Sequence, residues 1–200
     1  MKNGKFIVFE GIDGAGKSTQ IALLRAALEK MGYTVHHTAE PTDLPTGKML
    51  RAALAGKDPR SACEMATLFV LDRIAHNKEI EKALAAGEIV ICDRYYYSSL
   101  AYQGSLCDYQ WVKSMNVDCP EIRRPDLCVF LDLTPKDAIA RITARGEATE
   151  IYEKEETLSL FRDTFHRVFA SLTDRVAIVN AAPAPDAIAA EVLAAVKQVL

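Results

Sequence analysis

Short apolar runs alternate along the chain with longer segments in which apolar residues recur at helical spacing. The runs are rich in β-branched and aromatic residues and are almost continuously apolar, as expected for strands covered on both faces. They predict strands over 5–10, 34–38, 89–93, 127–133 and 176–180. The longer segments predict helices near 17–31, 61–86, 135–145, 154–172 and 184–199. This alternation is typical of βαβ units and a parallel sheet.

Glycine and proline mark several of these boundaries. Gly32 and Gly87 follow predicted helices, at the place where a left-handed residue commonly ends a helix. Pro135 begins another helix, where its missing N–H costs little. The sequence shows no internal repeat and no low-complexity linker, and 200 residues suit one α/β domain. We therefore expect a single domain over 1–200.

Composition and charge limit the kinds of binding partner and the cellular compartment that we expect for this protein. The net charge of −3 argues against a nucleic-acid polymer as partner, because such binders usually show a basic excess. The five cysteines form no C-x-x-C pair, which suits a reducing compartment. The apolar run at 6–9 is too short for a signal peptide, and no stretch reaches the ~18 apolar residues of a membrane span. We expect a cytoplasmic protein with no membrane segment.

A phosphate-binding pattern, G-x-x-x-x-G-K-[ST], lies between the first predicted strand and the first predicted helix. It consists of Gly11, Ile12, Asp13, Gly14, Ala15, Gly16, Lys17 and Ser18. Glycines let backbone N–H groups turn toward phosphate oxygens, and the helix N-terminus adds partial positive charge. Lys17 then reaches the β- and γ-phosphates, and the Ser18 hydroxyl is a ligand for Mg²⁺. The pattern predicts a site for ATP and Mg²⁺, and the absence of an N/T-K-x-D guanine motif argues against a GTPase.

Asp93 and Arg94 end the third predicted strand. In a doubly wound sheet, ligands bind beyond the carboxyl ends of the strands, so both side chains are expected beside the phosphate loop. An acid at this position holds Mg²⁺ or its water, and an arginine bridges donor and acceptor phosphates. The alternative for these two residues is an ion pair at a strand end.

Several segments, spread from residue 6 to about 153, resemble the thymidylate kinases. The matching segments are 9–19, 40–42, 69–73, 93–104 and 125–133. The block at 93–104 is the most specific of them, and the acid at Asp13 is part of the match at the phosphate loop. Phe69 and Arg73 are four residues apart and so lie on one helix face.

The resemblance implies a fold and an activity. The fold is the three-layer α/β P-loop NTPase fold, with a five-stranded parallel sheet, helices on both faces and a short lid near 145–153. The activity is phosphoryl transfer from Mg-ATP to deoxythymidine 5′-monophosphate (dTMP), which gives dTDP and ADP in nucleotide biosynthesis. A homodimer formed by helices on one face of the sheet is also implied.

The resemblance also implies roles on the acceptor side. Asp13 would accept a hydrogen bond from the 3′-hydroxyl, Phe69 would stack on thymine, and Arg73 would donate to a base carbonyl. Tyr102 would crowd the ribose 2′ position, and Arg94 would hold the acceptor phosphate. The full expected set is Asp13, Glu40, Pro41, Phe69, Arg73, Arg94, Ser99, Tyr102 and Gln103. As alternatives, Phe69 and Tyr102 are core residues and Arg73 is a solvated surface charge.

On the donor side, the resemblance adds Thr19, Arg141, Arg145 and Asn180 to the phosphate loop. Arg145 would contact phosphates from the base of the lid, Arg141 would lie near the adenine, and Asn180 would be in the adenine-side loop. The alternative for both arginines is an exposed helix end. The catalytic set is then Lys17, Asp93, Arg94 and Arg145, with Ser18 and Asp93 at the metal.

Two departures from the family pattern remove positive charge near phosphates. Ala39 stands where the family often has a basic residue, and 148–152 contains no arginine. Two alternatives therefore stay open. One is a kinase for another nucleotide or a deoxynucleoside, with Glu10 or Glu40 as the base; the other is an ATP-binding regulatory protein without turnover. We further expect Tyr95, Tyr96 and Tyr97 to divide between core and surface.

Overall fold

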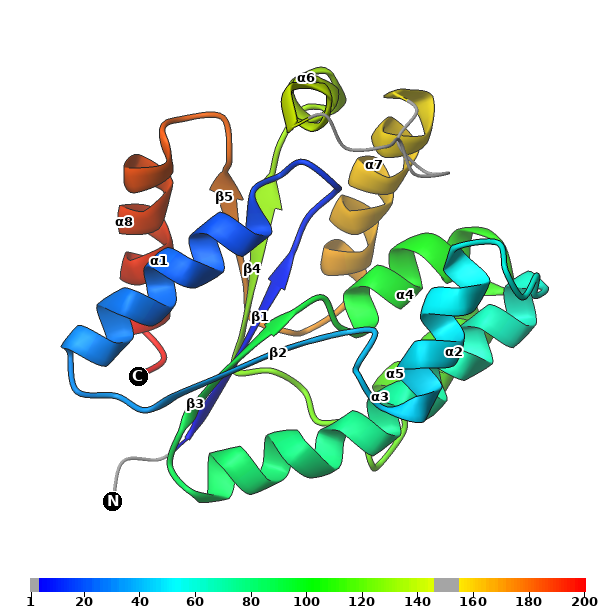
Figure 1. The fold of residues 1–200 in the computed structure, drawn as a ribbon, viewed down its shortest axis with the longest axis horizontal. Coiled ribbons are helices and arrows are strands. Elements are labelled where there is room, and N and C mark those ends of the chain that lie inside the picture. The colour runs from blue at the N-terminus through cyan, green and yellow to red at the C-terminus, as the bar shows by residue number, and fades with distance from the viewer. Residues whose placement is uncertain (1–3, 146–154) are drawn as a thin grey trace.

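The computed structural model describes residues 4–145 and 155–200. Within them, five strands form one parallel sheet in the order β2-β3-β1-β4-β5 (Figure 1). The strands are β1 (Lys5–Glu10), β2 (Val35–Ala39), β3 (Ile89–Asp93), β4 (Leu127–Asp132) and β5 (Val176–Asn180). The predicted fold class is therefore confirmed, and each predicted strand is present with its ends within one residue of the prediction.

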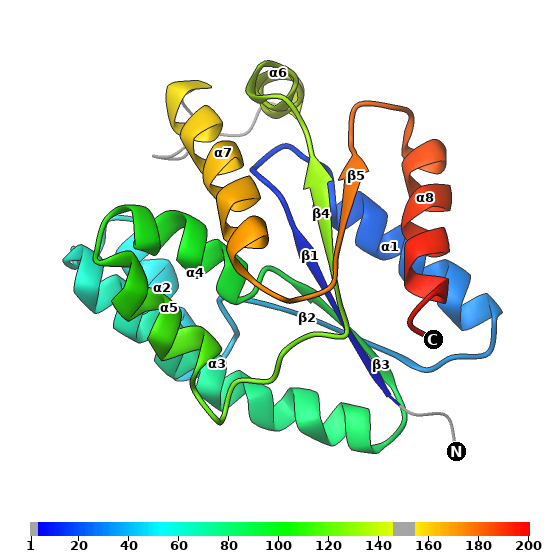
Figure 2. The ribbon, with the colours of Figure 1, turned by 180° about the vertical axis from the view of Figure 1, so that it is seen from behind.

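Helices cover both faces of this sheet. Helices α1 and α8 lie on one face, and α3, α4, α5 and α7 lie on the other (Figures 1 and 2). The helices are α1 (Lys17–Lys30), α2 (Pro45–Leu54), α3 (Ala62–Ala85), α4 (Tyr96–Tyr102), α5 (Tyr109–Val117), α6 (Pro135–Arg145), α7 (Glu155–Ser171) and α8 (Pro185–Lys197), with a 3₁₀ turn η1 (Gln103–Ser105). The sequence analysis did not predict α2, α4 or α5.

Alternating side chains of β1 supply both cores. Ile7 and Phe9 are buried with residues of α1 and α8, whereas Phe6 and Val8 are buried with residues of α3, α4 and α7. This two-sided burial explains the continuous apolar runs of β1, β3 and β4. The edge strands β2 and β5 are only partly buried, so the expectation of two-sided cover is wrong for them.

The glycines and the proline that marked predicted helix ends lie at helix ends in the structure. Gly32 and Gly87 adopt φ values of 80° and 82°, in the left-handed region. Pro135 is the first residue of α6. Each of these residues therefore has the backbone role that its type predicts.

The expectation that three consecutive tyrosines divide between core and surface is wrong. Tyr95, Tyr96 and Tyr97 are all fully buried. The hydroxyls of Tyr96 and Tyr97 donate to the Asp174 carboxylate, and that of Tyr95 donates to Asn77 Oδ1. Burial is tolerated because every hydroxyl has a partner.

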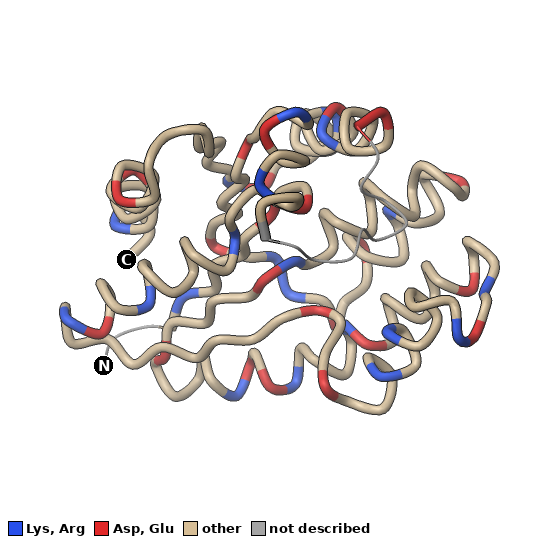
Figure 3. Tube along the Cα trace, turned by 45° about the horizontal axis from the view of Figure 1, so that its top comes forward, with Lys and Arg blue, Asp and Glu red and all other residues tan. Residues whose placement is uncertain are grey.

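Charged residues of both signs are interspersed along the described chain (Figure 3). The positive charge that phosphates require is therefore supplied locally, by the residues at the carboxyl ends of the strands. None of the described helices combines the length and the apolar character needed to cross a membrane.

Candidate active site

The phosphate loop joins β1 to α1 at the carboxyl end of the sheet (Figure 1). Gly14 has φ 80°, and a Cβ there would lie 2.6 Å from the Ala138 carbonyl oxygen, so only glycine fits against α6. Gly16 has φ 95° at the start of α1. Lys17 is buried, and its Nζ donates to the carbonyl oxygens of Gly11 (2.9 Å) and Ile12 (3.4 Å). The loop thus curves around its own lysine, as the pattern predicts.

Asp93 and Ser18 supply oxygen atoms suited to Mg²⁺. Within the described residues, the buried Oδ1 of Asp93 has no hydrogen-bond partner, which is unusual for a buried carboxylate. Ser18 is exposed in the first turn of α1, next to Lys17. Mg²⁺ usually takes only one or two protein oxygens and completes its shell with water and phosphates. The residues present therefore fit the predicted metal.

Arg94 lies between the phosphate loop and α4, and its backbone adopts the left-handed φ of 66°. Nη2 donates to Asp13 Oδ1, and Nη1 donates to the Tyr102 hydroxyl (3.3 Å) and the Gly11 carbonyl (3.4 Å). Burial alone would raise the pKa of Asp13, but the charges of Arg94 and Lys17 outweigh it and hold that pKa below its usual value. Asp13 is consequently an ionised partner that fixes Arg94 at the loop.

A cavity opens beside Arg94, at the place where the acceptor was predicted. It is lined by Asp13, Glu40, Pro41, Leu54, Phe69, Arg73, Arg94, Tyr95, Ser98, Tyr102 and Gln103. Every predicted acceptor residue except Ser99 is in this lining. The sequence analysis assigned no role to Leu54, Tyr95 or Ser98, of which Ser98 lies inside the segment that resembles the family signature.

Arg73 lines the cavity but is not a solvated charge, since its side chain is 1% exposed. Its Nε donates to Glu40 Oε2 at 2.8 Å, and its Nη1 donates to Ser99 Oγ at 3.2 Å and to Asn116 Oδ1. The buried His76 contacts the other oxygen of Glu40, with Nδ1 3.0 Å from Oε1. Ser99 is therefore outside the cavity lining, but its hydroxyl helps to hold Arg73, which is part of that lining. Asn116 and His76 were missed, although His76 lies one helical turn after Arg73.

Phe69 and Tyr102 are partly buried, and both line the cavity. Phe69 belongs to neither core cluster, so its interpretation as a core residue is wrong. The Tyr102 ring packs on Phe161 with centroids 4.3 Å apart, and the Arg94 guanidinium lies 5.6 Å from its centre. Tyr102 thus packs against the core and also borders the cavity, and its role toward the ribose stays a prediction.

On the donor side, Arg141 joins the phosphate loop to the segment after β5. Its Nη2 donates to the carbonyl oxygens of Ala181 (2.8 Å) and Ala182 (3.4 Å), and a Cβ on Gly16 would lie 3.8 Å from its Nη1. Asn180 Oδ1 accepts from the Ala182 N–H at 3.0 Å. Arg141 and Asn180 therefore both contact the segment after β5, and Arg141 also lies beside the phosphate loop; their roles toward the adenine stay predictions.

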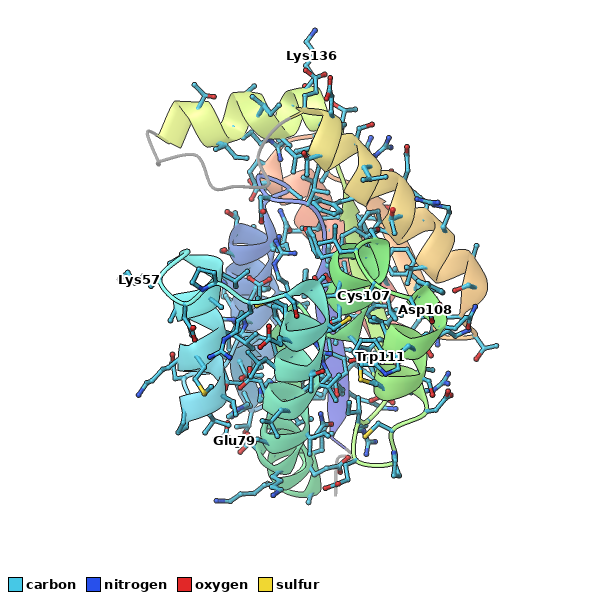
Figure 4. All side chains as sticks on the ribbon, turned by 90° about the vertical axis from the view of Figure 1, so that its right-hand side faces the viewer. Lys57, Glu79, Cys107, Asp108, Trp111 and Lys136 are labelled. Carbon is cyan, nitrogen blue, oxygen red and sulfur yellow. The ribbon has the colours of Figure 1, made fainter. Side chains whose placement is uncertain are left out.

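The remaining predicted positions are either exposed or outside the described residues. Thr19 is exposed in the first turn of α1, and Ala39 is an exposed residue at the end of β2. The side chain of Arg145 and residues 146–154 lie outside the described part of the chain, and with them the expected lid near 145–153 and the arginine-free 148–152. Lys57 and Lys136 are exposed and project away from the body of the molecule (Figure 4).

Comparison with known proteins agrees with this geometry. The family model described as thymidylate kinase matches residues 9–192. A probable thymidylate kinase of Pyrococcus horikoshii is 40% identical, with 98% of each chain covered. The thymidylate kinase of Desulfotalea psychrophila is 39% identical, with 98% of this chain and 96% of its own covered. The predicted resemblance is confirmed, and the chain belongs to the thymidylate kinase family.

Proposed function

We propose that this protein transfers the terminal phosphoryl group of Mg-ATP to dTMP, giving dTDP and ADP. The observation that carries the proposal is the position of Arg94, which contacts Gly11 and Asp13 of the phosphate loop while lining the acceptor cavity. A donor phosphate at the loop and an acceptor phosphate in the cavity would therefore lie on either side of one guanidinium. The names of the relatives support the same reaction.

Transfer needs positioning and charge neutralisation rather than a side-chain nucleophile. An acceptor phosphate oxygen forms the new P–O bond while the bond from the γ-phosphorus to the bridging oxygen of ADP breaks. Lys17 and Arg94 stabilise the charge on the transferring group from the loop side and the cavity side. Mg²⁺, held by Ser18 and Asp93, would orient the donor phosphates and neutralise part of their charge.

The cavity suits a deoxynucleoside monophosphate. In this proposal Phe69 stacks on the base, and Arg73 and Gln103 face its polar edge from positions fixed by burial. Asp13 accepts from the 3′-hydroxyl, and Tyr102 lies where it would crowd a 2′-hydroxyl. The ring of Tyr102 is held against Phe161, so it cannot move aside without cost.

A deoxynucleoside kinase would need a free carboxylate as the base for the 5′-hydroxyl. Glu10 is fully buried and accepts hydrogen bonds from the backbone and side chain of Ser98. Glu40 is engaged by Arg73 and His76. Since both candidate bases already have partners, the structure favours an acceptor that is ionised without a base, such as a monophosphate.

The test is a coupled ADP-release assay with dTMP, dUMP and UMP, with an acceptor-free reaction as the blank. We expect kcat/KM to be highest for dTMP and lower for UMP by roughly 10–200-fold, the range of a steric contact in a pocket. UMP as the best acceptor would overturn the substrate assignment. ADP release that is the same with and without acceptor would overturn the kinase assignment.

We also propose that the protein works in the cytoplasm, where its nucleotide substrates are.

We further propose that two copies of the chain associate. The layer containing α3 and α5 exposes Leu71 (51%), Leu106 (59%) and Trp111 (38%), apolar side chains that an association would remove from water. Figure 4 shows Trp111 on this layer. Light scattering should give twice the 22.0 kDa of one chain, and Leu71→Glu should reduce it to one. A monomeric wild-type protein would refute the association.

A further inference from the structure

Glu10 is a buried carboxylate that the proposed transfer reaction does not use. It is the last residue of β1, directly before the phosphate loop, and it is fully buried. Its Oε1 accepts from the backbone N–H groups of Tyr95 (2.9 Å) and Ser98 (3.1 Å) at the start of α4. A strand residue thus supplies the side-chain acceptor that the first turn of α4 lacks from its own cap residue.

The other oxygen of Glu10 is connected to Arg94 through one hydroxyl. Ser98 Oγ donates to Glu10 Oε2 at 2.7 Å and accepts from Arg94 Nη1 at 3.2 Å. The hydrogen bonds therefore run in one direction, from guanidinium to hydroxyl to carboxylate. Such a chain is strongest when its last acceptor carries negative charge, because each bond polarises the next.

From this geometry we infer that Glu10 and Ser98 are positioning residues for phosphoryl transfer, which hold the guanidinium of Arg94 between the phosphate loop and the acceptor. The inference rests on the proposed role of Arg94. It adds that the Arg94 guanidinium must also be held from the side of α4, which its contacts with the phosphate loop do not do. Asp13 and Gly11 fix the guanidinium from the loop side, and the chain to Glu10 fixes it from the side of α4.

The environment of Glu10 agrees with an ionised acceptor at the pH of an enzyme assay. Burial raises the pKa of Glu10 to about 7, while the charges of Arg94 and Lys17 and the hydrogen bonds from Ser98 and Tyr95 oppose a larger rise. At pH 8 the carboxylate is therefore mostly ionised. The backbone of Arg94 has a left-handed φ of 66°, which costs energy for a residue other than glycine and must be maintained by its surroundings.

The experiment is a double-mutant cycle with Ser98→Ala and Glu10→Gln at pH 8, with dTMP as acceptor. Ser98→Ala removes the linking hydroxyl and nothing else, and we expect kcat to fall about tenfold, as for one lost hydrogen bond to a charged group. The KM for dTMP should change less than about threefold. Glu10→Gln should lower kcat at least as much, because its amide presents a donor to Ser98.

Two features separate positioning from a general loss of structure. If Glu10 acts through Ser98, the double variant should be at most about twofold slower than the slower single variant. Ser105→Ala and Glu88→Gln are matched controls, since Ser105 Oγ donates to the Ala101 carbonyl within the same region and Glu88 lies at the opposite end of the sheet. Both should keep wild-type kcat.

Three results would overturn the inference while wild-type turnover remains intact. These are wild-type kcat in Ser98→Ala, losses that multiply in the double variant, and a fall in kcat that only matches a loss of folded protein in thermal melts. Failure of Glu10→Gln to fold leaves Ser98→Ala to decide. A wild-type enzyme that does not phosphorylate dTMP would instead refute the proposed function, so the two failures are distinguishable.

Discussion

The buried ion pair between Arg73 and Glu40 makes a specific prediction about stability. The side chains of Arg73 and Glu40 are 1% and 2% exposed, and Nη2 of Arg73 lies 2.6 Å from Oε2 of Glu40. In Glu40→Ala, the guanidinium stays buried among Ser99 and Asn116, which are neutral acceptors. His76 also loses the carboxylate that faces its Nδ1. The variant therefore leaves a buried positive charge without its counter-charge.

The expected cost follows from this burial. Removal of one partner of a buried ion pair typically costs about 3–5 kcal/mol, because desolvation of the remaining charge is no longer compensated. Single domains have a free energy of unfolding of about 5–15 kcal/mol, so the variant should still fold. For a chain of this size, about 2–4 °C is lost per kcal/mol, which predicts a Tm lower by roughly 6–20 °C.

Urea unfolding and thermal melts of the purified variants measure this cost. Glu81→Ala is the matched control, since Glu81 also pairs with an arginine, Arg123, but their side chains are 52% and 40% exposed. An exposed pair contributes about 0–1 kcal/mol, so the control should barely change stability. Equal losses in Glu40→Ala and Glu81→Ala would refute the argument from burial.

Three further predictions concern catalysis and pH. Lys17→Ala should lower kcat roughly a hundredfold or more with little change in Tm, and near-normal turnover would exclude the phosphate loop from the reaction. Arg145→Ala should lower kcat about a hundredfold with little change in the KM for dTMP, because the phosphate loop contains no cation besides Lys17 and 148–152 contains none; unchanged kcat with weaker ATP binding would make Arg145 a ground-state contact. The third concerns Glu10, whose folded-state pKa is about 7 instead of 4.5. Between these pH values only the unfolded chain has released the proton, so the free energy of unfolding should fall by about 3 kcal/mol as pH rises from 4.5 to 7. Urea unfolding across this range should show a flatter profile for Glu10→Gln, and identical profiles would contradict the assignment.

The sheet was predictable because its signals are local. Apolar or β-branched runs, Gly32, Gly87 and Pro135 each act within a few residues, and they placed the strands and the long helices, although β2 is neither continuously apolar nor covered on both faces. Helix α4 was missed for a physical reason. It has only seven residues, and the acceptor for its first turn comes from Glu10, which precedes Ser98 by 88 positions. A short helix stabilised by so distant a residue leaves no periodic pattern to detect.

The lining of the acceptor cavity was also predictable, because motif residues at the carboxyl ends of parallel strands converge. The hydrogen-bond and ion-pair partners of these cavity residues were not predictable. Arg73 appeared as a base-reading or solvated cation, yet it is fixed by Glu40 and Asn116, at separations of 33 and 43 residues. Both partners come from other elements, and their residue types alone do not identify them.

These pairings explain how an acidic chain can maintain a site for two anionic nucleotides. The two arginines that line the acceptor cavity are each compensated by an acid: Arg73 pairs with Glu40, and Arg94 with Asp13. For Lys17, the charges of Asp93, Asp13 and Glu10 oppose the lowering of its pKa by burial and by Arg94. Without these acids, the buried Lys17 and Arg73 and the partly buried Arg94 would be desolvated without compensation, which is costly relative to the stability of a single domain. The carboxylates therefore hold the cations in place before substrate binds. Incoming phosphates then interact with the same cations. Removal of an acid at this site should consequently lower the rate of catalysis as well as stability, because the cation that it holds is no longer fixed.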